Sequence, residues 1–257
     1  MADTQNKYND DDLASMSLGD HLEELRSRLG KSLIGLLAAF LGSLVVGRWF
    51  LAIVLSPFET AMEEVGVQMN LQAIEVAEPF LVYIKASLVL AALVSSPWLF
   101  YQAWAFVSAG LYKHERKFIH TAAPISALLF VAGVLFFLLG IAPMVFKFLA
   151  LFNLGVEYAY TPQITKAVNF ILVLSLVFGV AFQTPIAIVF AERMGLVTVQ
   201  TLQRIRKYVF LSTFVVAAVA TPPDIVSQLA LAGALYVLYE SSIIICRLWR
   251  KKRRESD

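Results

Sequence analysis

Residues 32–55 read SLIGLLAAFLGSLVVGRWFLAIVL, a stretch in which Arg48 is the only charged side chain. A helix that crosses the roughly 30 Å hydrocarbon core of a membrane needs about 20 mostly apolar residues, so this stretch predicts a transmembrane helix at Ser32–Leu55. Four further stretches have similar length and composition: Pro79–Val107, Thr121–Phe146, Ala167–Phe190 and Ile225–Cys246. The sequence therefore predicts an all-α, polytopic integral membrane protein.

A sixth apolar segment, Tyr208–Ala220, is too short to cross an unperturbed bilayer. At about 1.5 Å per residue it spans only some 20 Å. Because Val209–Ala220 carries no charge, this segment is not expected to be a solvated loop. We predict six transmembrane helices, of which the fifth in chain order is short. Whether the sixth, Ile225–Cys246, is also short in effect is left open.

The composition of the whole chain supports the membrane assignment. Of its 257 residues, 59% are apolar and 16% are charged, and the mean hydropathy is +0.71, whereas soluble domains have about 45–50% and about 25%. The formal net charge of +2 argues against a nucleic-acid partner. A single cysteine, Cys246, excludes an internal disulfide and a multi-cysteine metal site, and no cofactor is expected.

Lysine and arginine are distributed unequally between the predicted connections, and this asymmetry predicts the orientation. Seventeen of them lie in the N-terminal segment, the second and fourth connections and the C-terminal tail, whereas the opposite side has only Lys147 and Lys166. Both termini are therefore expected in the cytoplasm. We divide the chain into a disordered N-terminus (1–16), one six-helix transmembrane domain with an N-terminal amphipathic helix (17–248) and a basic tail (249–257).

Prolines fall inside several of the predicted spans. Pro97, Pro143 and Pro185 each remove a backbone donor and are expected to bend their helices, and kinked helices that lean together would form a cupped bundle. The alternative is that neighbouring helices satisfy the freed carbonyls and the prolines are merely tolerated. Ser56-Pro57 is expected to end the first helix on the outer side.

The segment before the first span has the pattern of an amphipathic helix. Residues 17–20 have the Ser-x-x-Asp form of a capping box, and His21, Glu24 and Arg28 fall on one flank of a leucine stripe. One interpretation is an interfacial helix with an internal Glu24–Arg28 pair, which stabilises it by about 0.3–0.5 kcal/mol. The other is a helix end that displays a carboxylate to a cationic ligand. The leucines of the stripe are Leu18, Leu22, Leu25 and Leu29.

Four short runs, in this order along the chain, together resemble the TatC family of the twin-arginine protein translocase. They are HLEELRSRL at 21–29, YQAWAF at 101–106 leading into GLYKHER at 110–116, FGVAFQTP at 178–185, and TPPDIVSQ at 221–228. The resemblance extends from Leu18 into the last helix. It also agrees with the six helices and two inner termini of that family.

The resemblance implies a receptor in the bacterial inner membrane that binds twin-arginine signal peptides of folded cargo. It also implies single-helix partners, TatA and TatB, a homo-oligomer within the complex, and transport driven by the proton-motive force. Glu24 and Glu115 match the glutamates that contact the two arginines, and a carboxylate suits the planar fork of arginine better than the point charge of lysine. The other implied contacts are His21, Arg26, Phe106, Tyr112, Lys113 and His114.

Polar residues at membrane depth are further candidates. Gln183, with Pro185, is expected in an intramembrane groove; many relatives have a glutamate there, but a glutamine cannot titrate. It could bond a signal-peptide backbone or simply link two helices, a bond contributing about 0.6 kcal/mol. By resemblance, TatA and TatB contact the last two helices, with Thr221, Gln228 and Glu240 as candidates. Asp224 suits the positive N-terminal end of the last helix.

Two other classes of function are considered. A secondary transporter of a small solute would use Gln183 and Glu240 as a mid-membrane site, but no internal repeat is visible. A passive assembly scaffold would bind the partners without preferring one signal peptide over another. An enzyme is not expected, because the sequence contains neither a phosphate-binding Gly-x-x-x-x-Gly-Lys run nor a His-Glu-x-x-His motif.

Overall fold

The computed structural model describes residues 18–66, 71–109, 117–154, 162–221 and 224–256 of the chain. These residues are helical apart from short turns and one isolated β-bridge between Gln72 and Gln163. Among them, five helical segments are long and apolar enough to cross a membrane. The prediction of an all-α, multi-pass membrane fold is thus confirmed. The five segments are Gly19–Val65, Glu78–Ser108, Thr121–Asn153, Ile164–Arg193 and Ile225–Arg250.

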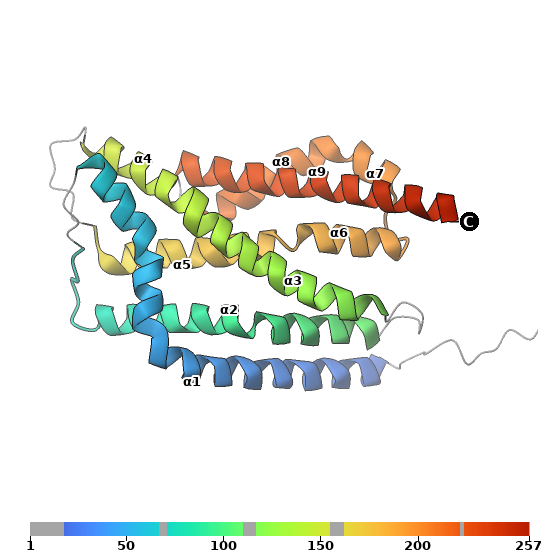
Figure 1. Ribbon diagram of the computed structural model, residues 1–257, viewed down its shortest axis with the longest axis horizontal. Helices are drawn as coiled ribbons and strands as arrows, with labels where there is room; N and C mark the ends of the chain where they lie inside the picture. Colours follow the sequence, from blue (N-terminus) through green and yellow to red (C-terminus); the bar gives the residue numbers. More distant parts are fainter. Residues whose placement is uncertain (1–17, 67–70, 110–116, 155–161, 222–223, 257) are drawn as a thin grey trace, which may run out of the picture.

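The helices lie side by side, with one rod laid across them (Figure 1). Helices α1 and α2 pair along much of their length, α5 and α6 follow each other in one line, and α8 packs on α9. The rod formed by α3, η2 and α4 crosses this layer and contacts α1, α2 and α5. The bounds are α1 (Leu18–Val65), α2 (Glu78–Ala109), α3 (Lys117–Phe136), η2 (Phe137–Ile141), α4 (Ala142–Leu154), α5 (Ile164–Ala181), α6 (Thr184–Arg193), α7 (Val199–Arg204), α8 (Arg206–Ala220) and α9 (Ile225–Ser256).

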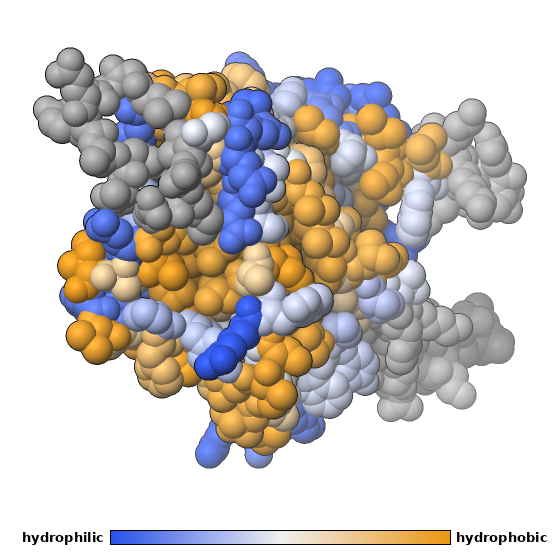
Figure 2. Space-filling view, turned by 60° about the vertical axis from the view of Figure 1, so that its left-hand side comes forward, coloured by the Kyte–Doolittle hydropathy of each residue, from blue (hydrophilic) through white to orange (hydrophobic). Residues whose placement is uncertain are grey.

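The outer surface of the bundle is largely apolar. Orange side chains cover much of the face in Figure 2 and are interrupted by a few hydrophilic ones. Large apolar residues of α1 are more than half exposed, as expected of a helix that faces lipid tails rather than water. They include Leu33, Ile34, Leu37, Leu41 and Val45.

The first helix differs from the prediction in both its start and its end. The amphipathic segment and the first span form a single helix, α1, which continues through Pro57 to Val65 and bends sharply about halfway (Figure 1). The expected helix end at Ser56-Pro57 is therefore wrong. The last part of α1 runs across the end of the bundle that is poor in lysine and arginine, and it packs against α4.

A hydroxyl group before each of three prolines explains how the chain tolerates them. A helical proline leaves the carbonyl four residues earlier without its N–H donor. The hydroxyls of Ser56, Ser96 and Thr184 donate to that carbonyl, on Ile53 at 2.8 Å, Leu93 at 2.7 Å and Ala181 at 2.7 Å respectively. Helix α2 accordingly runs without a break through Pro97, and the bend predicted there is absent (Figure 1).

The other two predicted bends coincide with irregular backbone. One turn of π-helix, η2, precedes Pro143, and the N–H of Ala142 bonds the carbonyl of Phe137 five residues earlier. The regular helix α5 ends at Ala181, Phe182 and Gln183 form a tighter turn, and Pro185 lies in the first turn of α6. The predicted span Ala167–Phe190 is therefore two helices, whereas α3, η2 and α4 continue as one rod past Pro143 (Figure 1).

Helix α8 has only 15 residues, which is about 22 Å at 1.5 Å per residue. It is not among the five segments long enough to span the membrane. The sixth crossing remains a prediction, since a length of this kind crosses only where the bilayer is thinned or deformed.

A close crossing of α3 and α5 holds the centre of the molecule together. Small residues let two membrane helices approach closely. A Cβ atom on Gly133 would lie 2.6 Å from the carbonyl oxygen of Phe178 and 3.0 Å from Cα of Gly179. Around this crossing, Phe130, Val134, Phe137 and Phe178 are buried in one apolar core.

Candidate functional site

The first turns of α1 and the last turns of α2 form a polar seam, which we define by His21, Glu24, Arg28, Gln102 and Phe106. The Nε of Arg28 donates to the Glu24 carboxylate at 2.6 Å, and its Nη1 donates to the Gln102 side-chain carbonyl at 3.0 Å. The Glu24 and Arg28 side chains are 29% and 26% exposed, whereas Gln102 is buried. The guanidinium thus bridges a surface carboxylate and a buried amide.

Two aromatic contacts fix the same pair of helices beside the seam. The ring of His21 stacks on that of Phe106, with centroids 4.5 Å apart and planes 28° from parallel. About one turn along α1 from Arg28, the indole N–H of Trp98 donates to the backbone carbonyl of Lys31 at 3.0 Å. These contacts hold the Glu24 carboxylate at a defined place relative to α2.

The structure brings together some of the predicted ligand contacts and leaves others untested. His21, Glu24 and Phe106 lie in the seam, while Arg26 is exposed on another side of α1. The remaining predicted contacts, Tyr112, Lys113, His114 and Glu115, lie outside the described residues, as does the N-terminus before Leu18. Both sequence interpretations of the amphipathic segment are compatible with this geometry, because the internal Glu24–Arg28 pair exists and its carboxylate is partly exposed.

Gln183 links two helices. Its side-chain N–H donates to the backbone carbonyl of Ser126, on α3, at 3.1 Å. The hydroxyl of Ser126 accepts the indole N–H of Trp104 at 2.8 Å, so this bond belongs to a chain that joins α2, α3 and the α5–α6 break. The geometry agrees with the helix–helix alternative. Pro185 lines a cavity between α3, α6 and α9.

The candidate partner contacts lie on α8 and α9, at two levels. Thr221 is buried and its hydroxyl donates to the Ala217 carbonyl at 2.9 Å, whereas Gln228 is partly exposed. Glu240 accepts from Nη2 of Arg206 at 2.7 Å, so it is paired rather than simply solvated. Asp224 accepts from the Ser227 N–H at 2.7 Å and caps the start of α9, as its position indicates.

Two contacts of the candidate residues were missed in the sequence, and only the first, between Arg206 and Glu240, left a signal there. Arg206 and Glu240 lie 15 residues before Thr221 and 16 after Asp224, so a tight α8–α9 hairpin places them at the same depth. Gln102 stands in the quoted run YQAWAF, but its role depends on the register of α1 against α2, which no local pattern reveals.

These features define a class before any comparison: a helical, multi-pass membrane protein with a polar, charged seam at one end and no mid-membrane charge cluster among the described residues. The family model described as Sec-independent protein translocase protein (TatC) matches residues 20–233. TatCy of Bacillus subtilis is 35% identical over 244 residues, which cover 94% of this chain and 93% of that protein. TatC of Escherichia coli K12 is 33% identical over 238 residues, or 92% and 90% of the two chains.

A solved structure agrees with this result. The crystal structure of the twin-arginine translocase receptor TatC superposes with a TM-score of 0.75 at 32% identity, covering 89% of this chain and 98% of that one. The chain belongs to the TatC family. It is therefore a multi-pass membrane subunit of a Sec-independent, twin-arginine protein translocase that works with other Tat subunits, and it is not an enzyme.

Proposed function

We propose that this subunit is the receptor for twin-arginine signal peptides, and that the α1–α2 seam binds the paired arginines through Glu24. The single observation that carries the proposal is the Arg28–Glu24 contact, because it shows that this carboxylate accepts a guanidinium in its present position. In the complete site, Glu115 would supply a second carboxylate.

Binding would proceed by exchange. An i,i+4 ion pair on a helix surface stabilises by only about 0.3–0.5 kcal/mol, so an incoming guanidinium can replace Arg28 at low cost. Gln102 then retains Arg28 through Nη1, and the displaced cation stays hydrogen-bonded. Since a carboxylate accepts arginine through two parallel bonds but lysine through one, the seam favours arginine in the signal.

The remaining parts of the proposal concern topology and partners. The segments that carry the seventeen cations would face the cytoplasm, on the inner side of the bacterial inner membrane, with residues 17–248 as one domain. TatA- and TatB-like helices would dock on α8 and α9, where Gln228 is the favoured contact because its side chain is partly exposed. The proton-motive force would drive transport, and several copies would assemble in the complex.

The solute-transporter alternative receives no support from the polar residues that suggested it. Gln183 is bonded to α3 and Glu240 to Arg206, so the two do not form one site.

The test compares binding of a signal peptide containing Arg-Arg with that of its Lys-Lys twin to the full chain in lipid nanodiscs. The wild type should prefer Arg-Arg, and Glu24→Gln should lower that preference about fivefold, since a charged hydrogen bond exceeds a neutral one by about 1 kcal/mol. Glu23→Gln removes an exposed carboxylate one residue away and should leave the preference intact. An unchanged preference in Glu24→Gln would exclude this role, and a wild type with no preference would favour the scaffold.

A further inference from the structure

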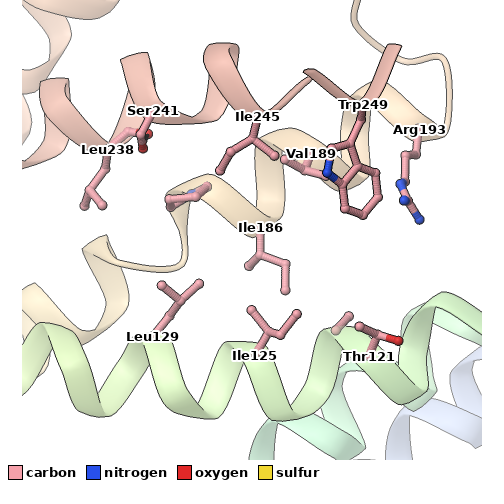
Figure 3. Close-up of a pocket in the computed structure, with 12 residues that line it drawn as sticks. Thr121, Ile125, Leu129, Ile186, Val189, Arg193, Leu238, Ser241, Ile245 and Trp249 are labelled. Atoms are coloured by element: carbon pink, nitrogen blue, oxygen red, sulfur yellow. Dashed lines mark hydrogen bonds between the residues drawn. The ribbon is translucent and has the colours of Figure 1, made fainter. Parts of the chain in front are cut away.

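A groove separate from the α1–α2 seam lies between α3, α6 and α9 (Figure 3). It has a volume of about 580 Å³, within the range of roughly 300–1,000 Å³ typical of ligand pockets. Its walls are apolar for most of their length. The apolar lining consists of Ile125, Leu129, Ile186, Val189, Leu238 and Ile245.

The length of the groove matches one membrane leaflet. Along α9 it extends from Leu238 to Trp249, a rise of about 16 Å, and half of a roughly 30 Å hydrocarbon core is about 15 Å. Indole side chains favour the membrane–water interface, so Trp249, which is 46% exposed, marks the headgroup level. The groove therefore begins among the headgroups and ends near the bilayer midplane.

The headgroup end of the groove is cationic and polar. The guanidinium of Arg193 lies over the Trp249 ring, 3.9 Å from its centroid, and the exposed Thr121 stands across from them (Figure 3). A cationic pocket between helices at the headgroup level is complementary to an anionic lipid.

The length and charge of the groove indicate its occupant. An acyl chain reaches from the headgroups to the bilayer midplane, and a phosphate group meets the cation at the headgroup end. We propose that the groove binds an anionic phospholipid, with one acyl chain between α3, α6 and α9 and the phosphate on Arg193.

The test measures lipid binding to the full chain in detergent by native mass spectrometry, with phosphatidylglycerol and phosphatidylcholine as probes. We expect one tightly bound phosphatidylglycerol, with an affinity about tenfold above that of phosphatidylcholine, the amount typical of one charge-assisted hydrogen bond. Arg193→Gln should remove most of this preference and Arg193→Lys should retain it. Ile186→Trp, which fills the groove, should weaken the binding of both lipids.

The matched control is Arg48→Gln, because Arg48 is exposed on α1, far along the chain from the groove. It should bind phosphatidylglycerol as the wild type does. Thermal midpoints measured without added lipid identify any variant that is misfolded. Arg193→Lys keeps the positive charge, so it distinguishes loss of charge from loss of folding as the cause of weaker lipid binding. Equal affinity for the two lipids, an unchanged preference in Arg193→Gln, or displacement of the lipid by a signal peptide would each overturn the assignment. None of these results bears on Glu24, so the receptor proposal is tested separately.

Discussion

The α3–α5 crossing predicts a specific cost for adding one methyl group. In Gly133→Ala, the new Cβ would lie 2.6 Å from the Phe178 carbonyl oxygen, whereas ordinary van der Waals contact begins at 3.4 Å. The two nearest backbone atoms belong to α5, so a side-chain rotation cannot relieve the contact and the helices must separate by about 0.8 Å locally. Overpacking of this kind costs about 1–3 kcal/mol.

Part of this cost is offset, because alanine is a better helix former than glycine by up to about 1 kcal/mol. Because a contact of 2.6 Å with backbone is severe, the cost lies in the upper part of its range, and the expected net loss is about 1–2 kcal/mol. At about 2–4 °C per kcal/mol for a chain of this size, the thermal midpoint should fall by about 2–8 °C. The buried Cys246 provides the assay, since it is the only cysteine and a thiol-reactive dye will label it only as the chain unfolds.

Gly42→Ala is the matched control, because a Cβ there meets nothing within 4 Å. Its midpoint should stay equal to that of the wild type or rise slightly. If Gly133→Ala and Gly42→Ala have the same midpoint, the close crossing does not limit the packing of these helices and the reasoning is refuted.

Three further predictions follow from single contacts. Ser96→Ala leaves the Leu93 carbonyl without a donor and should lower the thermal midpoint. Ser95→Ala should have less effect, because the Ser95 hydroxyl bonds a carbonyl that already accepts a helical backbone N–H. Equal effects would contradict the account of Pro97. Gln102→Leu leaves Arg28 with one partner and should weaken Arg-Arg peptide binding about two- to fivefold. Its thermal midpoint should change no more than that of Gln200→Leu, which alters an exposed amide. Unchanged peptide binding would remove Gln102 from the site. Lengthening α8 by four leucines should reduce export in cells but not peptide binding, since it removes the length mismatch; undiminished export would end the idea that a thinned bilayer assists transport.

The spans were predictable because their signal is local. Length and hydropathy alone identify the five long segments, which the structure also contains, although the fourth is divided into α5 and α6. The end of α1 was not predicted correctly, since proline was taken to stop the helix. The Ser-Pro pair itself contains the missing information, as a serine hydroxyl reaches the carbonyl that proline leaves free.

The site was predictable only where its members share one helix. His21, Glu24 and Arg28 lie at spacings that place them on one flank of α1, and the predicted ion pair exists. Gln102 and the Phe106 stack require the register between α1 and α2, and the Gln183 bond requires the position of α3. Such contacts depend on how helices pack against one another, which a periodic pattern along one helix does not determine.

Electrostatics links the seam to the lipid groove, because both lie at the cation-rich end of the bundle. In the proposed orientation, a signal bearing two arginines approaches segments in which, taken together, lysine and arginine outnumber aspartate and glutamate, and at physiological ionic strength such charges act over about 8 Å. Glu24 attracts the signal only within that distance, so any anion that neutralises the surrounding surface raises the association rate. A phospholipid on Arg193 would be such an anion. Arg-Arg peptide should therefore associate faster in nanodiscs that contain phosphatidylglycerol, and Arg193→Gln should reduce this dependence on the lipid while leaving the preference for Arg-Arg over Lys-Lys unchanged.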